Sequence, residues 1–279
     1  FVIIKHLFSK LHNPIIYDFI NMPVGKNFGV SKKDRVNILK KIIKIINNIE
    51  SATSLESQVI LAKCLLSLPK NKKGYVVECG CFKGASSATL SLICKFIGRK
   101  LIIYDSFEGL PKTANNKRAN YMHLAAKEEY REGMYRGNLQ TVKENIGKFG
   151  NIDVCVFRKG FFEKTLSLHK EKIEFIFLDV DLPSSTKLCI KYLWKKILIN
   201  SYIFTDDSCD MENVRIWFDN KWWKELFGIN SPGYVGSGCG LPSSSGCHAL
   251  GRPGGSQLTA KCELRSNHQP PTTWLGTYS

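Results

Sequence analysis

Aspartates follow two apolar runs of the chain, at positions where their carboxylates could share one cation. The four residues, two after each run, are Asp179, Asp181, Asp206 and Asp207. If the runs are neighbouring strands of a parallel sheet, these carboxylates converge at its carboxyl edge and repel one another. A hard divalent cation with oxygen ligands, for which magnesium is expected, would relieve that repulsion. In the alternative, Asp181, Asp207 or nearby Ser184 caps a helix.

A glycine-containing turn follows an earlier apolar run and opens a helical pattern. It reads ECGCFKGAS over residues 78–86. Glycine lets the backbone approach a ligand closely, and the first turn of a helix offers free N–H groups to a carboxylate or phosphate. The turn lacks the third glycine of a dinucleotide fingerprint. A plain strand-to-helix turn therefore stays open as an alternative.

A carboxylate also ends the next apolar run. Asp105 lies about twenty residues beyond the glycine turn, where an acid can accept hydrogen bonds from both hydroxyls of a ribose. Together the turn and the acid indicate a cofactor that contains a nucleoside. A buried capping role for Asp105 is the alternative.

Short apolar runs alternate with helical patterns from Tyr75 onward. The expected strands are 75–79, 100–104, 153–157, 174–178 and 202–205. The expected helices are 86–97, 138–148, 162–167, 184–197 and 212–227. This alternation predicts an α/β protein with a doubly wound, mainly parallel sheet, whose ligands bind at the carboxyl ends of the strands.

Three regions are expected along the chain: a helical N-terminal extension, a cofactor-binding domain and an irregular tail. Their bounds are 1–73, 74–228 and 229–279. Residues 34–52 place apolar side chains on one helical face and lysines elsewhere, which indicates a solvated lysine face or, alternatively, a basic docking surface. Residues 106–136 are polar and too long for a tight connection, so we expect a lid. The tail is rich in Gly, Ser and Pro.

The composition excludes fewer kinds of protein than the motifs do. The net charge of +16 would suit a nucleic-acid or anionic-membrane partner, but no aromatic base-holding motif points to nucleic acid. The ten cysteines are scattered without CxxC spacing, so no structural zinc site is expected. No signal peptide is visible and no apolar run approaches the roughly 18 residues that span a bilayer, so a cytoplasmic protein is expected. A homo-oligomer is compatible with the sequence.

Six segments resemble the macrocin O-methyltransferase family, within the class I methyltransferases that use S-adenosylmethionine. They are VVECGCFKGASSATLS, LIIYDSFEGLP, GNLQTVKENIGKFG, VFRKGFFEKTL, FLDVDLPSST and YIFTDD. They run from about residue 75 to 207 in the family's order, and DSFEGLP and LDVDLxxST are the most specific. The resemblance implies a Rossmann-like sheet and metal-dependent O-methylation of a sugar or another polyhydroxylated small molecule. The antiparallel hairpin that ends the class I sheet is not evident here, and nothing is recognisable beyond about residue 243.

The resemblance also implies roles for individual residues. The positions implied for the cofactor are Glu78, Gly80, Gly84 and Ser86 near its methionine part, Asp105 and Ser106 at its ribose, and Gly160 and Phe161 near its adenine. The implied metal ligands are Asp179, Asp206 and Asp207. Asp181 is the candidate for the base or an outer ligand, and the division of labour between Asp179 and Asp181 is open.

The expected mechanism follows from charge. A bound metal lowers the pKa of a sugar hydroxyl, a carboxylate takes its proton, and the alkoxide attacks the methyl group of the sulfonium in line. One alternative is a metal-dependent nucleotidyl or phosphoryl transferase, but the P-loop that would hold its phosphates is absent. Another is a basic nucleic-acid-binding module, which would leave the aspartates unexplained.

Overall fold

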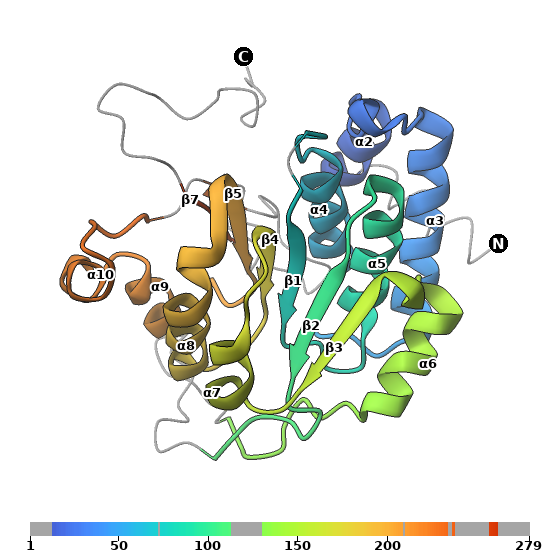
Figure 1. Cartoon of the computed structure of the whole chain (residues 1–279). Helices are drawn as coiled ribbons and strands as arrows, with labels where there is room; N and C mark the ends of the chain where they lie inside the picture. The colour runs from blue at the N-terminus through green and yellow to red at the C-terminus, as the bar shows by residue number, and fades with distance from the viewer. Residues whose placement is uncertain are drawn as a thin grey trace, which may run out of the picture.

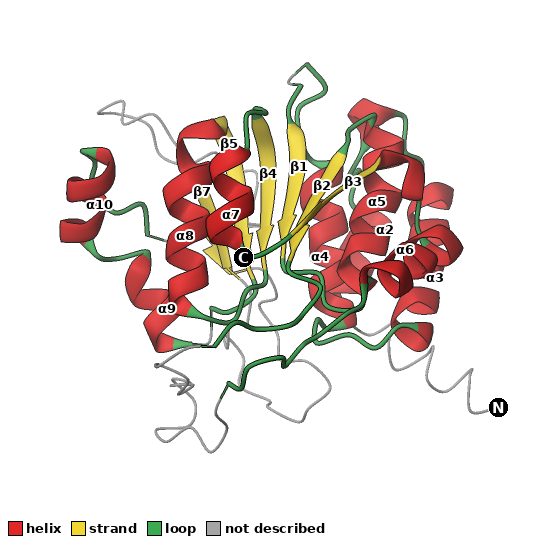
Figure 2. Cartoon of the chain, turned by 60° about the horizontal axis from the view of Figure 1, so that its bottom comes forward, coloured by secondary structure: helices red, strands yellow, loops and turns green. Residues whose placement is uncertain are grey.

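A central sheet carries helices on both faces (Figures 1 and 2). The computed structural model describes residues 13–71, 73–112, 130–208, 210–233, 236–237 and 257–261. The strands are β1 (Tyr75–Cys79), β2 (Leu101–Asp105), β3 (Cys155–Lys159), β4 (Ile173–Leu178), β5 (Ile197–Thr205), β6 (Gly236–Ser237) and β7 (Gln257–Lys261). Their order across the sheet is β3-β2-β1-β4-β5-β7-β6.

The first five strands are parallel, which confirms the predicted doubly wound α/β fold. The chain builds outward from β1 in two directions, first through β2 and β3 and then through β4 and β5. The loops that follow the neighbouring strands β1 and β4 therefore lead to opposite faces of the sheet. A crevice opens at such a switch point, outside the carboxyl ends of the strands, and ligands bind there in this class of sheet.

Two short strands lie within the tail that the sequence indicated as irregular. β7 pairs antiparallel with β5, and β6 pairs antiparallel with β7. The sequence did not predict these strands, because apolar and polar residues alternate little in this segment. Sheet pairing uses backbone groups, so a strand can form at an edge without a clear side-chain pattern.

Helices from both ends of the described chain enclose the sheet. They are α2 (Pro14–Asn21), α3 (Lys32–Asn48), α4 (Leu55–Leu66), α5 (Ala85–Ile97), α6 (Leu139–Phe149), α7 (Phe162–Thr165), α8 (Pro183–Leu193), α9 (Met211–Ile216) and α10 (Asn220–Phe227). Short 3-10 turns are η1 (Lys26–Phe28), η2 (Ile152–Val154), η3 (Leu166–Leu168) and η4 (Trp194–Lys196). Helices α2 to α6 cover one face and α7 to α8 the other, with α9 and α10 beside α8 (Figure 2).

The N-terminal helices begin at capping residues that the sequence displays. Ser31 and Asp34 form a reciprocal capping box at the start of α3, which satisfies two backbone N–H groups that the helix leaves free. Ser54 caps α4 by a single hydrogen bond, which its side chain accepts from the N–H of Ser57. The Ser54 cap lies in the turn between α3 and α4, and this turn reaches the carboxyl edge of the sheet, where Ala52 lines a pocket and Thr53 approaches Asp179.

Each face of the sheet has its own apolar core. The first core joins α2 to α6 with β1, β2 and β4, and includes Ile42 of α3 and Leu61 of α4, both fully buried. The second lies under α8 and α10 and centres on Trp217 and Trp223. The N-terminal helices therefore share one apolar core with the strands that carry the site. No helix among the described residues is long and apolar enough to cross a membrane.

Candidate active site

A pocket lies at the switch point of the sheet, where strands β1 to β4 end. Among the residues that line it are Gly80, Phe82, Asp105, Ser106, Phe161, Asp179 and Asp181. Its open volume is about 70 Å³, well below the volume of typical small-molecule sites.

Gly80 lets the glycine turn pass directly against the end of β4. Its backbone has a φ of 83°, and a Cβ atom placed there would lie 1.8 Å from the carbonyl oxygen of Asp179. Gly84, at a φ of 86°, opens α5, and its Cβ would press on Val142 of α6 at 3.0 Å. Glycine is thus required at both positions by backbone conformation and by close approach.

Asp105 joins the glycine turn to the loop that follows β2. Its Oδ2 accepts a hydrogen bond from the backbone N–H of Cys81 at 2.7 Å, and its Oδ1 accepts one from Phe107 at 2.6 Å. Burial raises the pKa of this carboxyl, although these hydrogen bonds lower it. The side chain is nevertheless part of the pocket wall, so each oxygen can still accept from a ligand.

Glu78 lies beneath the pocket and does not line it. Its side chain is fully buried, its Oε2 accepts a hydrogen bond from Ser87 at 2.5 Å, and its Oε1 has no partner among the described residues. Burial raises the pKa of Glu78 to about 8, against hydrogen bonds from Ser86 and Ser87 that lower it. At neutral pH this carboxyl is therefore mostly protonated in the ligand-free protein.

The residues expected to hold the cofactor divide into two groups. Gly80, Asp105, Ser106 and Phe161 line the pocket. The others lie behind its wall: Glu78, Gly84, Ser86 and Gly160. Gly160 donates its N–H to the backbone carbonyl oxygen of Asp105 at 2.9 Å, which ties the loop after β3 to the end of β2.

The structure brings the aspartates together at the ends of β4 and β5. Leu178 and Thr205 are paired in the sheet, so the residues after them are neighbours, and the N–H of Asp206 donates to the carbonyl oxygen of Leu178 at 2.8 Å. Burial raises the pKa of Asp179 well above its usual value, and the charges of Asp206 and Asp207 add to this effect. The convergence expected from strand order is present.

Asp207 binds the backbone of the loop after β4 but does not cap α8, whose N-cap is Leu182 without a side-chain hydrogen bond. The Oδ2 atom of Asp207 accepts hydrogen bonds from the backbone N–H groups of Val180 at 3.2 Å and Asp181 at 2.9 Å. This holds Asp181 in a left-handed conformation with a φ of 57°, and Asn213 donates to its carbonyl oxygen at 2.8 Å. Within the part of the chain that the structure describes, no three His, Cys, Asp or Glu side chains are grouped as metal ligands.

A family model described as macrocin-O-methyltransferase (TylF) matches residues 61–232. The chain belongs to this family. It is therefore an S-adenosylmethionine-dependent O-methyltransferase, and the phosphoryl-transferase alternative gives way to methyl transfer. No curated protein sequence matches the chain significantly.

Two solved structures share the fold of this O-methyltransferase. The O-methyltransferase NovP is 18% identical over 75% of this chain and 81% of its own, with a TM-score of 0.55. The calicheamicin methyltransferase CalS11 is 15% identical over 83% of this chain and 93% of its own, with a TM-score of 0.50. At these identities the likeness supports the class I architecture alone.

The methyltransferase pocket has walls that the sequence did not indicate. Ala52 lines it from the turn between α3 and α4, and the neighbouring Thr53 directs its Oγ1 toward Oδ2 of Asp179 at 3.5 Å. Phe82 and Tyr135 line the opposite part, with their rings edge to face at 5.8 Å between centroids. No local pattern marks Ala52 or Thr53, and although Phe82 lies in the glycine turn and Tyr135 in the expected lid segment, only tertiary packing brings their rings together.

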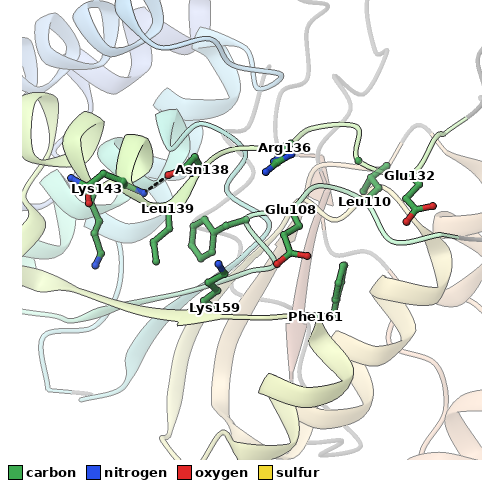
Figure 3. Close-up of a pocket in the computed structure, with 12 residues that line it drawn as sticks. Glu108, Leu110, Glu132, Arg136, Asn138, Leu139, Lys143, Lys159 and Phe161 are labelled. Carbon is green, nitrogen blue, oxygen red and sulfur yellow. Dashed lines mark hydrogen bonds between the residues drawn. The ribbon is translucent and has the colours of Figure 1, made fainter.

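A second, larger pocket of about 590 Å³ lies beside the first (Figure 3). The two share Leu110 and Phe161, and the lining of the second includes exposed charged side chains such as Glu108, Arg136 and Lys159. It contains none of the aspartates that follow β4 and β5. Of the four aspartates, Asp179 and Asp181 line the smaller pocket.

Proposed function

We propose that this O-methyltransferase methylates a hydroxyl of a sugar or of another polyhydroxylated small molecule, assisted by a divalent cation. One observation carries the proposal: the carboxylates after β4 and β5 meet beside the pocket that the glycine turn and Asp105 form. The sugar acceptor comes from the family resemblance of the six segments. It is a proposal for this chain.

The cofactor is proposed to lie along the ends of β1, β2 and β3. The free N–H groups of the turn after Gly80 and the first turn of α5 suit its carboxylate. The Asp105 oxygens suit the two ribose hydroxyls. Phe161 offers an apolar face to the adenine. The sulfonium methyl would then point toward Asp179 and Asp181.

Carboxylate side chains in the pocket wall are suited to take the acceptor's proton. Asp179 and Asp181 both line the pocket, and a carboxylate with a raised pKa is a stronger base once it is ionised. Asp181 is held in position by Asp207 and Asn213, which supports a role in orienting the hydroxyl. The pocket would hold the two reacting groups together at reacting distance.

The carboxylates also fit a hard divalent cation such as Mg²⁺. The oxygens of Asp179, Asp206 and Asp207 are the donors such an ion prefers, and their mutual repulsion favours it. When bound, the ion would lower the pKa of the acceptor hydroxyl. Asp207 already accepts two backbone N–H groups, so its remaining lone pairs would serve the ion.

Calorimetry with S-adenosylmethionine and S-adenosylhomocysteine tests the cofactor site, and a screen of glycosides and nucleotide sugars tests the acceptor. Activity should fall on chelation and return with Mg²⁺, and the double variant Asp206→Ala, Asp207→Ala should lose that response. Full activity in chelator would refute the metal proposal. Methylation of only non-hydroxyl acceptors would refute the acceptor class.

A further inference from the structure

Lysines gather at the amino edge of the sheet, opposite the active site. They lie in the segments that lead into four of the parallel strands: Lys70, Lys73, Lys95, Lys100, Lys170, Lys172, Lys195 and Lys196. All are exposed except Lys196, which is half-buried. Because parallel strands all begin at the same edge, these residues form one surface, here called the amino-edge surface. It faces the top of Figure 1, whereas the carboxyl ends of the strands point to the bottom.

The acids near this surface do little to offset its charge. Glu174 is fully buried and paired with Arg99 at 2.7 Å. Glu171 is paired with Arg158 at 3.5 Å and lies near the His169 ring. Asp153 is exposed and Lys100 donates to its backbone carbonyl oxygen at 2.8 Å, so its carboxylate offsets one of the lysine charges at most. The amino-edge surface therefore carries a strong positive charge.

Large apolar side chains protrude from the same surface. Tyr75 begins β1, Phe96 lies in the last turn of α5, and Ile199 lies near the start of β5; they are 36%, 44% and 44% exposed. Ile199 lies in an irregular part of β5, because Ile197 pairs with Ile173 whereas Phe175, two residues further along β4, pairs with Tyr202, five residues further along β5. The bulged strand thus presents an apolar side chain outward rather than into a core.

We propose that the amino-edge surface binds the interface of an anionic lipid bilayer. Lysines near an anionic membrane each contribute to attraction, and exposed aromatic and aliphatic side chains among them can enter the headgroup region. Nucleic acid would use the lysines, but an aliphatic side chain such as Ile199 gains nothing from a phosphate backbone. The combination of charge with protruding apolar groups therefore favours the bilayer.

Binding in this way would hold the active site away from the bilayer. The pocket opens at the carboxyl ends of the strands, on the opposite edge of the sheet from the lysines (Figure 1). A bound enzyme would keep its pocket open to acceptors in solution. Binding to the bilayer thus does not depend on which acceptor the enzyme uses, and it can be measured without an activity assay.

Co-sedimentation of the full chain with vesicles tests the proposal. The vesicles contain phosphatidylcholine alone or phosphatidylcholine and phosphatidylglycerol at about two to one. Wild-type protein should bind only the anionic vesicles, and more weakly at high salt. The charge-reversal variant Lys70→Glu, Lys73→Glu, Lys170→Glu, Lys172→Glu should partition at least about tenfold more weakly.

A matched variant separates this surface from the protein's overall charge. Lys40→Glu, Lys41→Glu, Lys221→Glu, Lys224→Glu changes the net charge equally at exposed positions of α3 and α10. It should retain most of the binding, and both variants should keep the wild-type melting temperature and cofactor affinity. Equal loss in the two variants, or no binding of wild-type protein to anionic vesicles, would overturn the proposal.

The apolar residues have a separate test. Phe96→Gln with Ile199→Thr leaves every charge in place, and it should remove the part of the binding that persists at high salt. Unchanged salt-resistant binding would contradict insertion of these side chains. Binding of a single-stranded oligonucleotide without binding to vesicles would assign the surface to nucleic acid and reject the bilayer.

Discussion

At the residue scale, Asp105 combines a structural role with its proposed binding role. The carboxylate accepts backbone N–H groups from Cys81 and Phe107, so it holds the glycine turn against the loop after β2. The same oxygens line the pocket. A change at this position therefore alters both the shape of the pocket and its contacts with a ribose.

We expect Asp105→Ala to weaken S-adenosylmethionine binding by at least about a hundredfold, because charged hydrogen bonds to the ribose are lost and the turn loosens. Asp105→Asn keeps an acceptor for one of the two backbone N–H groups and should fold more stably than the alanine variant. Calorimetry gives the affinities. Wild-type affinity in Asp105→Ala would contradict the assigned site.

Glu78 makes the stability of the ligand-free enzyme depend on pH. Its folded-state pKa of about 8 lies above its ordinary value of 4.5, so between these values the folded protein holds a proton that the unfolded chain has lost. The free energy of unfolding therefore decreases as pH rises through this window. Below the lower value both states are protonated and the effect vanishes.

Glu78→Gln should flatten this dependence, because a buried amide does not titrate. Chemical unfolding at several pH values between about 5 and 8 measures how the free energy of unfolding depends on pH. Glu144→Gln, an exposed position on α6, is the control and should keep the wild-type slope. A wild-type slope in Glu78→Gln would show that another group is responsible.

At the element scale, the glycine turn is interlocked with the segment that precedes α6. A Cβ atom on Gly137 would lie 1.6 Å from the carbonyl oxygen of Phe82, and Asn145 donates to the carbonyl oxygen of Lys83 at 2.9 Å. Phe82 and Tyr135 both have positive φ values, 47° and 54°. Such strained backbone persists only where the surrounding structure holds it.

Gly137→Ala should push these two segments apart, and we expect a loss of stability of about 1–3 kcal/mol with weaker cofactor binding. Gly147→Ala is the matched control. That glycine lies within α6 with no atom within 4 Å of an added Cβ, so alanine should stabilise the helix by about 0.5–1 kcal/mol. Thermal unfolding and calorimetry compare the two. If the Gly137→Ala and Gly147→Ala variants were equally stable, the close packing of Gly137 against the glycine turn would be contradicted.

The bounds of the strands and helices show where local sequence patterns were enough to predict the structure. The expected strand 75–79 matches β1, and the expected helix 86–97 differs from α5 by one residue. The expected helix 212–227 is instead two helices, because Asp219 caps a new one through the N–H of Trp222 at 3.0 Å. The expected lid over residues 106–136 falls partly on 113–129, outside the described residues.

At the scale of the whole molecule, the N-terminal helices are part of the same apolar core as the cofactor-binding strands. Ile42→Ala on α3 removes a fully buried side chain and should lower the free energy of unfolding by about 2–5 kcal/mol. We expect one cooperative transition that reports on both regions. Lys41→Ala, exposed on the same helix, is the control. A separate early transition of the helices would contradict a shared core.

The sequence by itself determined the alternation of the five parallel strands with helices, the glycine turn and the acids at the strand ends. These follow from periodicity and from residue types near one another in the chain. Only the tertiary structure decided which residues form the remaining walls of the pocket, including Thr53 near Asp179 and Tyr135 against Phe82. It also decided that the lysines before separate strands form one surface. Such contacts join distant parts of the chain, and their partners are chosen by packing rather than by any local pattern.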